Sequence, residues 1–253
     1  MRLEAYALTD PGPVREQNED FFAVLEDEGL FLLADGMGGH AAGEVASRLA
    51  VETVKDVVLG ELDPDETRLD RVIEDYPDML RERMRYAMNQ ASLRIRQEAL
   101  ATPAYAGMGT TLVSLLIEDG MANLAHVGDS RIYLYRNRRL QRLTRDHTVV
   151  QMELDAGRIT PDLARVVPHK NILTQSVGFH GPVEPDTSTR PVDDDDVFLL
   201  CSDGLTDPLD DDALTAICAA HDPPELPDAL VQAALQAGGD DNITVIVVHI
   251  VKA

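Results

Sequence analysis

The sequence has little of what builds disulfide frameworks, zinc sites or aromatic cores. It contains no tryptophan, 2 cysteines and 4% aromatic residues among 253 positions. Cys201 and Cys218 lack the Cys-x-x-Cys spacing of a zinc site, so we expect two buried, reduced thiols. The core therefore has to consist of Val, Leu, Ile, Ala and Met, which suits strands and amphipathic helices equally.

Basic residues are also scarce. Lys and Arg number 22 against 45 Asp and Glu, which leaves a formal charge of −23. Nucleic acids and anionic membrane surfaces bind proteins through clusters of Lys and Arg, so we expect no nucleic acid partner. The composition favours cations as small partners.

Long apolar runs are missing as well. The longest, Val245–Val251, is interrupted by His249 and is too short to cross a bilayer. The first residues contain no apolar run of the length that a signal sequence needs. We therefore expect a cytoplasmic protein without a membrane segment, and a monomer.

Short β-branched stretches bounded by turn residues predict strands. One pair is joined by Asp119-Gly120, which is a strong signal for a hairpin and hence for antiparallel pairing. The predicted strands are Phe21–Leu25, Leu30–Ala34, Thr111–Glu118, Ala122–Val127, Arg131–Tyr135, Val197–Ser202 and Ile243–Val251.

Helical periodicity predicts four longer helices, grouped in two pairs. They are Ala41–Leu59 and Asp78–Leu100, separated by an acidic loop at Gly60–Tyr76, and then Asp210–Ala220 and Pro224–Ala237. Strands in two runs with paired helices indicate a layered α+β fold.

Acidic residues recur at the predicted strand ends, where segments distant in the sequence can converge. Converging carboxylates repel each other unless cations lie between them, and such hard oxygen ligands favour Mg²⁺ or Mn²⁺ over zinc. The clusters are Asn18-Glu19-Asp20, Asp35-Gly36, Gly128-Asp129-Ser130, Ser202-Asp203-Gly204 and Asp240-Asp241-Asn242.

Taken in order, these and neighbouring motifs form a specific series over almost the whole chain. The series is Arg15-Glu-Gln-Asn-Glu-Asp20, Asp35-Gly-Met-Gly-Gly-His40, Gly109-Thr-Thr111, Val127-Gly-Asp-Ser-Arg131, Leu143-Thr-Arg-Asp-His147, Cys201-Ser-Asp-Gly-Leu205 and Asp241-Asn-Ile-Thr244. It resembles the PP2C-type (PPM family) metal-dependent serine/threonine protein phosphatases, bacterial branch.

The resemblance implies a four-layer α-β-β-α sandwich of two mainly antiparallel sheets flanked by helix pairs. It also implies one domain over residues 1–253, with a flap-like segment at about 147–181. The implied activity is hydrolysis of phosphoserine and phosphothreonine in proteins by attack of a metal-bridging water. Its partners would be phosphorylated proteins and the bacterial Ser/Thr kinase whose phosphorylation it reverses.

The resemblance also implies a set of metal ligands for two Mn²⁺ or Mg²⁺ ions. Asp35 corresponds to the carboxylate that bridges both ions, and the Gly36 carbonyl corresponds to a ligand of one of them. Asp203 and Asp241 correspond to the remaining ligands of the other ion.

Further positions correspond to residues around those ions. Glu19 and Asp20 match positions that hold metal-bound waters, and Asp129 matches the position that helps to bind a third, weaker metal. Arg15 resembles the arginine that binds the substrate phosphate, a role suited to a planar guanidinium fork. His40 resembles the general acid, since an imidazole can protonate a leaving alkoxide near neutral pH. From pattern alone, His40 could equally cap the following helix.

The residues are also compatible with two other functions. The stretch Gly36-Met-Gly38-Gly-His-Ala41, with Asp56 about twenty residues onward, satisfies a dinucleotide-binding pattern. That pattern would require a parallel strand after the first helix, where an acidic loop and another helix are predicted instead. The other alternative is a phosphatase-like metal-binding regulatory domain without turnover.

Three smaller features involve an acidic run, three histidines and a basic run. Asp193–Asp196 reads as a solvated turn, and His126, His147 and His169 read as structural side chains. A basic ribbon on this acidic chain is either an exposed strand and turn or a docking face for phosphorylated segments. Its members are Arg136, Arg138, Arg139, Arg142 and Arg145.

Overall fold

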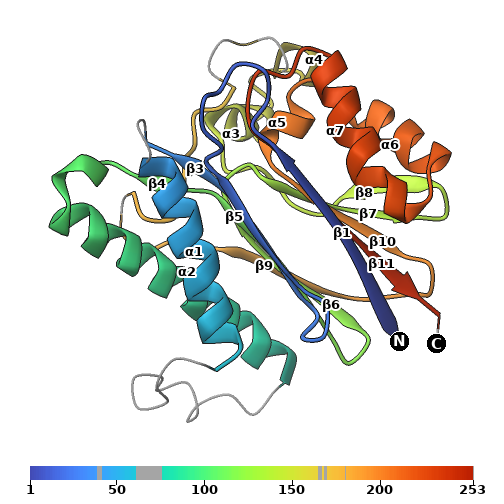
Figure 1. Ribbon diagram of the computed structural model, residues 1–253, viewed down its shortest axis with the longest axis horizontal. Helices are drawn as coiled ribbons and strands as arrows, with labels where there is room; N and C mark the ends of the chain where they lie inside the picture. Colours follow the sequence, from blue (N-terminus) through green and yellow to red (C-terminus); the bar gives the residue numbers. More distant parts are fainter. Residues whose placement is uncertain (39–41, 61–75, 165–166, 168–169, 180, 253) are drawn as a thin grey trace.

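Two antiparallel sheets face each other, and a pair of helices covers each outer face (Figure 1). This computed structural model describes residues 1–38, 42–60, 76–164, 167, 170–179 and 181–252. The predicted four-layer α-β-β-α sandwich is confirmed.

All strand pairs between described residues are antiparallel. The first sheet has, in spatial order, β1 (Arg2–Asp10), β11 (Ile243–Val251), β10 (Val197–Cys201), β7 (Arg131–Arg136) and β8 (Arg139–Arg142). The second has β2 (Asp20–Leu25), β3 (Leu30–Met37), β5 (Leu112–Glu118), β6 (Met121–Val127) and β9 (Asp186–Pro191), with β4 (Gly109–Thr110) paired to β3. The chain therefore offers no parallel β-α-β unit in its described part, and the dinucleotide alternative loses its structural basis.

Helices α1 (Ala42–Val58) and α2 (Tyr76–Ala101) pack on the second sheet, and α6 (Asp211–Ala220) and α7 (Leu226–Gln236) pack on the first. The shorter helices are α3 (Val149–Asp155), α4 (Pro161–Ala164), α5 (Asp203–Thr206), and the 3-10 turns η2 (Pro103–Tyr105) and η3 (Pro223–Glu225). The acidic loop predicted at Gly60–Tyr76 falls mostly outside the described residues.

The central strands are buried on both faces, which explains their continuous apolar sequences. In β3, Leu32 packs under α1 and α2, whereas its neighbour Phe31 packs between the two sheets. In β11, Val247 packs under α6 and α7 while Ile246 lies between the sheets. Because successive strand side chains point to opposite faces, each of these strands contributes to two cores at once.

Besides the two-residue β4, three strands were not predicted from the sequence, and these three lie at sheet edges: β1, β8 and β9. Their side chains are partly or fully exposed along most of their length. An edge strand needs no continuous apolar pattern, because pairing with its neighbour determines its conformation.

Two hairpin turns have both central residues in the left-handed region. Asp119 and Gly120 have φ of 49° and 73°, which confirms the predicted hairpin between β5 and β6. Asn137 and Arg138 have φ of 52° and 59° between β7 and β8. The second turn has no clear sequence signal, because its second central residue is Arg138, where a hairpin turn of this kind usually has glycine.

The prediction of a solvated turn at Asp193–Asp196 is wrong for Asp196. Its side chain is buried and accepts hydrogen bonds from Arg136 Nε at 2.6 Å and from the Asp193 backbone N–H at 2.8 Å. No helix among the described residues is long and apolar enough to cross a membrane.

Candidate active site

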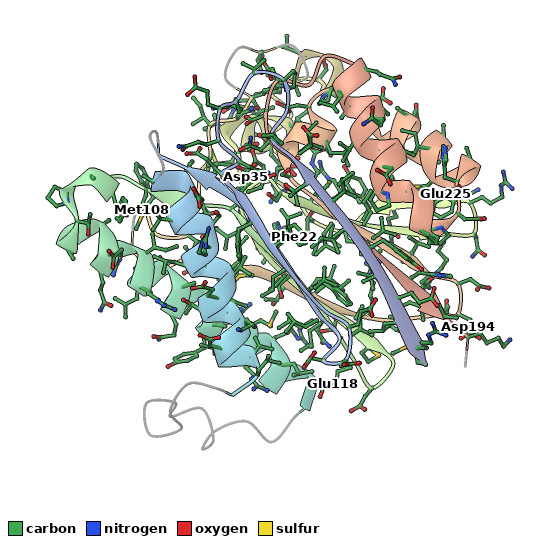
Figure 2. All side chains as sticks on the ribbon, viewed as in Figure 1. Phe22, Asp35, Met108, Glu118, Asp194 and Glu225 are labelled. Atoms are coloured by element: carbon green, nitrogen blue, oxygen red, sulfur yellow. The ribbon has the colours of Figure 1, made fainter. Side chains whose placement is uncertain are left out.

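The predicted acidic residues converge at one end of the sandwich, where Figure 2 labels Asp35. Asp20 and Asp35 are directly paired on β2 and β3. Asp203 is the first residue of α5, immediately after β10, and Asp241 precedes β11. Asp129 lies in the turn between β6 and β7. Both sheets thus contribute acids to the same end.

The convergence raises the pKa values of these carboxyl groups. Burial raises the pKa of Asp35 well above its usual value, and the charges of Asp20 and Asp203 raise it further. Burial followed by the charge of Asp203 likewise raises the pKa of Asp129. The pKa of Asp203 is raised to about 6 by burial, then by Asp207 and Asp241. Burial and mutual repulsion thus favour the protonated forms of these groups, whereas cations bound between them would favour the ionised forms.

Asp20 carries an unsatisfied oxygen. Its Oδ2 accepts hydrogen bonds from Ser202 Oγ at 2.8 Å and Thr244 Oγ1 at 2.6 Å. Its Oδ1 is buried and has no hydrogen-bond partner among the described residues. Burial raises the pKa of Asp20 to about 8, although the two hydroxyl groups oppose the shift. A buried carboxylate oxygen without a donor indicates a place for a cation or an ordered water.

Glycine allows the loop, strand and helix around Glu19 to approach closely. A Cβ on Gly36 would lie 2.2 Å from the Gly43 carbonyl oxygen, and a Cβ on Gly43 would lie 2.6 Å from Glu19 Cδ. The Gly43 backbone donates a hydrogen bond to the Glu19 carboxylate, whose pKa is nevertheless raised, chiefly by burial. Any larger residue at either position would separate Glu19 from the start of α1.

Arg15 reaches the acidic cluster from the loop between β1 and β2. Its Nη2 donates to Asp241 Oδ2 at 2.7 Å, and about half of its side chain is exposed, at 51%. Burial opposes its charge, but the charge and hydrogen bond of Asp241 raise the Arg15 pKa overall. Asn242 secures the loop by donating to the carbonyl oxygens of Pro11 and Gln17 at 2.9 and 3.0 Å.

Lys170 and Asn171, in the segment predicted to be flap-like, also touch the site. Lys170 Nζ forms an ion pair with Asp207 at 2.9 Å, and Asn171 Nδ2 donates to Asp207 at 3.2 Å and to Asp203 at 3.4 Å. A groove of about 750 Å³ opens beside them, lined also by Asp129. No sequence motif marks Lys170 or Asn171. Ser202 and Thr244 lie in motifs that carry the family resemblance, but their contacts to Asp20 depend on the tertiary fold.

His40, the predicted general acid, lies outside the described residues. Its role therefore stays a prediction.

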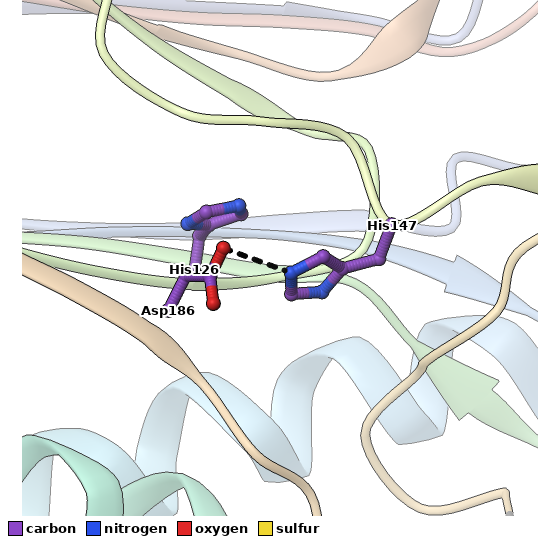
Figure 3. A group of neighbouring side chains, drawn as sticks. All are labelled: His126, His147 and Asp186. Atoms are coloured by element: carbon purple, nitrogen blue, oxygen red, sulfur yellow. Dashed lines mark ion pairs between the residues drawn. The ribbon is translucent and has the colours of Figure 1, made fainter. Parts of the chain in front are cut away.

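A second group of potential metal ligands is present at His126, His147 and Asp186 (Figure 3), whose ligand atoms lie within 4.8 Å of one another. The two imidazole rings are stacked, with centroids 4.8 Å apart and planes inclined by 24°. The Gly128 backbone N–H donates to His147 Nδ1 at 3.3 Å, so Nε2 carries the proton that faces Asp186 at 3.4 Å. Lone pairs in nearly parallel rings do not converge on one ion, so the group acts as a structural contact between β6, β9 and the residues before α3.

Most of the predicted basic ribbon is also structural. Arg136 pairs with Asp193 and Asp196, Arg142 donates to Gln151, and Arg145 pairs with Asp155. The two remaining members, Arg138 and Arg139, are exposed and form no ion pair with a described residue.

The donor set at the acidic end suits divalent cations. It consists of carboxylate oxygens with the backbone carbonyl of Gly36, which are the ligands that Mg²⁺ and Mn²⁺ prefer. The raised pKa values and the unsatisfied Asp20 oxygen describe a site short of positive charge. Neutralising metal ions would remove both features.

Comparison with known sequences identifies close relatives. The sequence profile of protein phosphatase 2C matches residues 14–235. Serine/threonine protein phosphatase PstP of Mycobacterium tuberculosis is 38% identical over 249 residues, which cover 98% of this chain and 45% of that protein. Protein phosphatase PhpP of Streptococcus pneumoniae is 39% identical over 250 residues, which cover 97% of each chain. The chain thus spans under half of the mycobacterial relative and nearly all of the pneumococcal one.

Solved structures agree with this similarity. The catalytic domain of PstP in complex with 2 manganese ions superposes with a TM-score of 0.81 at 37% identity, covering 99% of both chains. Stp1 from Staphylococcus aureus superposes with a TM-score of 0.86 at 32% identity, covering 100% of this chain and 96% of that one. The chain described here belongs to the protein phosphatase 2C family.

Proposed function

We propose that this chain is a metal-dependent protein phosphatase that hydrolyses phosphoserine and phosphothreonine in proteins. One observation carries the proposal: buried carboxyl groups from both sheets meet at one end of the sandwich, where burial and mutual repulsion raise their pKa values, and one Asp20 oxygen has no partner among the described residues. The names of the relatives support the same activity, since PstP and PhpP are protein phosphatases.

Two divalent cations, Mn²⁺ or Mg²⁺, fit this end of the sandwich. Asp35, the Gly36 carbonyl, Asp203 and Asp241 would hold them directly, while Glu19 and Asp20 would hold them through water. Asp129 would contribute to a third, weaker position. When bound, such ions neutralise phosphoryl charge and lower the pKa of a water molecule, so that no protein nucleophile is needed.

The protein side chains position the reacting groups. The hydroxyls of Ser202 and Thr244 fix one oxygen of Asp20 and leave the other free to orient a water. Arg15 lies at the rim, half exposed and held by Asp241, so its guanidinium can donate a bidentate pair of hydrogen bonds to two phosphate oxygens. His40 would donate the proton to the departing serine or threonine oxygen.

The wider setting follows from this chemistry as a set of predictions. The substrates would be phosphorylated proteins, modified by a cognate Ser/Thr kinase whose action the phosphatase reverses. We further propose a single domain over residues 1–253, acting as a cytoplasmic monomer. The flap-like segment at 147–181 would form one wall of the substrate groove, because Lys170 and Asn171 already contact the acidic site.

Hydrolysis of an aryl phosphate and of a phosphothreonine peptide, with and without Mn²⁺, tests the proposal. We expect turnover of both substrates that depends on the metal and is lost in Asp203→Asn. Asp212→Asn, an equal charge change on the exposed face of α6, should behave like the wild type. Metal binding without turnover would instead establish a regulatory domain and overturn the proposed activity.

A further inference from the structure

A basic pocket lies at the end of the sandwich opposite the acidic site. It has a volume of about 650 Å³ and is lined by Arg136, Arg139 and Arg190 together with the amide side chains of Asn137 and Gln141. None of its described lining residues is acidic, although the chain carries 45 Asp and Glu. A local concentration of guanidinium groups on so acidic a protein indicates a specific anion site.

The pocket opens at the edge of the sandwich, where the two sheets end. Arg139 and Gln141 belong to β8, the last strand of the first sheet, and Arg190 belongs to β9, the last strand of the second. Figure 2 shows Asp35 and Asp194 at opposite ends of the molecule, and Arg136 pairs with Asp193 beside the pocket. The pocket is therefore remote from the acidic site.

Arg190 is the unusual member of the lining. Its Nε is buried and has no hydrogen-bond partner among the described residues. Burial and the nearby charge of Arg136 lower the Arg190 pKa, and the charge of Asp196 only partly opposes that shift. Because buried donors are nearly always paired in native proteins, an unpaired guanidinium N–H on a residue that lines a pocket indicates a missing acceptor.

The three arginines differ in how far their charges are already compensated. Arg136 is held by Asp193 and Asp196, so it forms a fixed wall. Arg139 is exposed and has no ion pair with a described residue, and Arg190 has its unpaired Nε. These two guanidinium groups remain available for a ligand, and phosphate is the anion that such planar forks bind most effectively.

We propose that this pocket binds a second phosphorylated residue of the same protein substrate, away from the residue being hydrolysed. The inference rests on the proposed phosphatase activity and identifies a class of preferred substrate, namely multiply phosphorylated segments. The pocket anchors the substrate and takes no part in the hydrolysis.

The strand that joins the two sites sets the spacing between the two phosphates. β7 starts at Arg131, two residues after Asp129, and ends at Arg136 in the pocket wall. Five steps along a strand span roughly 17 Å. An extended peptide covers that distance with about five residues, so the two phosphorylated residues must be at least that far apart.

The test compares phosphothreonine peptides that carry a non-hydrolysable phosphonate analogue of a second phosphoresidue. The second group is placed either about three or about eight residues away, and is replaced by Glu or Ala in matched peptides. We expect the distant phosphonate to lower KM about tenfold relative to Ala, while Glu and the short spacing give little gain.

Arg139→Glu and Arg190→Gln should each abolish this gain while leaving aryl phosphate hydrolysis unchanged. Arg138→Glu is the matched control, because it makes the same charge change on the neighbouring turn residue, which does not line the pocket. Loss of the gain in Arg138→Glu to the same extent would overturn the proposal in favour of general electrostatic attraction. Equal KM values for the phosphonate, Glu and Ala peptides would also overturn it.

Aryl phosphate turnover separates this proposal from the phosphatase activity itself. Direct binding of a labelled phosphonate peptide to Asp203→Asn gives a readout that needs no turnover. If that binding is weakened about tenfold by Arg190→Gln, the pocket is a phosphate site whatever the reaction at the acidic end. Unchanged binding in both pocket variants would exclude it.

Discussion

Two buried aspartates show how differently this fold treats negative charge at its two ends. Asp196, whose side chain has 0% exposure, forms an ion pair with Arg136 and accepts a hydrogen bond from a backbone N–H. Asp20, also buried, accepts hydrogen bonds from two neutral hydroxyl groups, and its other oxygen has no partner among the described residues. One carboxylate is compensated by the protein and the other is not.

The difference separates structural charge from functional charge. Burying an ionised carboxylate costs several kcal/mol unless a cation or several donors compensate it, as Arg136 does for Asp196. The acids around Asp20 lie close together, and burial and their mutual repulsion raise their pKa values, although Arg131 and Lys170 partly oppose the shifts. A group of buried acids that the protein does not compensate is an incomplete site, whereas a paired acid is part of the framework.

The largest expected effect comes from removing a carboxylate at the uncompensated end. Asp35→Asn should lower kcat with an aryl phosphate by about 10³-fold or more, because metal ions contribute several kcal/mol to phosphoryl transfer. The metal-free variant should melt at a higher temperature than the metal-free wild type at neutral pH, because an asparagine is buried without the proton uptake that the buried Asp35 carboxyl group requires. A variant that keeps wild-type activity in Mn²⁺ would show that Asp35 holds no essential ion.

Removing the cation that compensates Asp196 should lower stability and leave activity unchanged. Arg136→Ala leaves Asp196 buried without its cation and should destabilise the fold by roughly 3–5 kcal/mol. Aryl phosphate turnover per folded molecule should not change, because the pair lies far from the acidic site. Urea unfolding with a parallel activity assay measures both. Loss of activity without loss of stability would contradict the division between the two ends.

The pH dependence of stability sharpens the same comparison. The pKa of Asp20 is raised to about 8 and that of Asp203 to about 6 in the folded chain, so without metal the folded state binds more protons than the unfolded state. The resulting stability is fully present below about pH 4, the unfolded value, and is lost as pH rises toward 8.

Thermal melting in chelator should therefore show this decline, with a contribution from Asp203 alone of roughly 2–3 kcal/mol. Saturating Mn²⁺ should remove the decline, since bound cations stabilise the ionised carboxylates. Identical pH profiles with chelator and with Mn²⁺ would indicate that the acids do not form a metal site.

The smallest of these effects concerns Arg15 at the rim. Arg15→Ala removes charge-assisted hydrogen bonds worth about 1.5–3 kcal/mol and should lower kcat/KM for an aryl phosphate about 10- to 100-fold. Arg15→Lys should recover only part of the loss, because an ammonium group cannot form the bidentate pair. Arg2→Ala, which removes an exposed arginine on β1, serves as the control. Equal activity of all three variants would remove Arg15 from the site.

The buried strands and the turn between β5 and β6 were predictable because their signals are local. Phe31 and Leu32 stand in a continuous apolar run, and Asp119-Gly120 favours the left-handed turn that joins β5 to β6. β9 and the turn at Asn137-Arg138 were not predictable, because neighbouring strands hold them in place. The burial of Asp196 was hidden for the same reason, since its partner Arg136 lies sixty positions earlier in the chain.

The sequence by itself determined the chemical character of the site and the family to which the chain belongs. Acids at successive strand ends, an arginine before them and glycines beside them are local patterns that can be read in order along the chain. Tertiary structure alone decided which of these acids are compensated. It brought Ser202 and Thr244 to Asp20, Arg136 to Asp196, and an unpaired Arg190 into a basic pocket. Compensation requires direct contact over a few ångströms, and only the packing of two sheets brings such distant residues together.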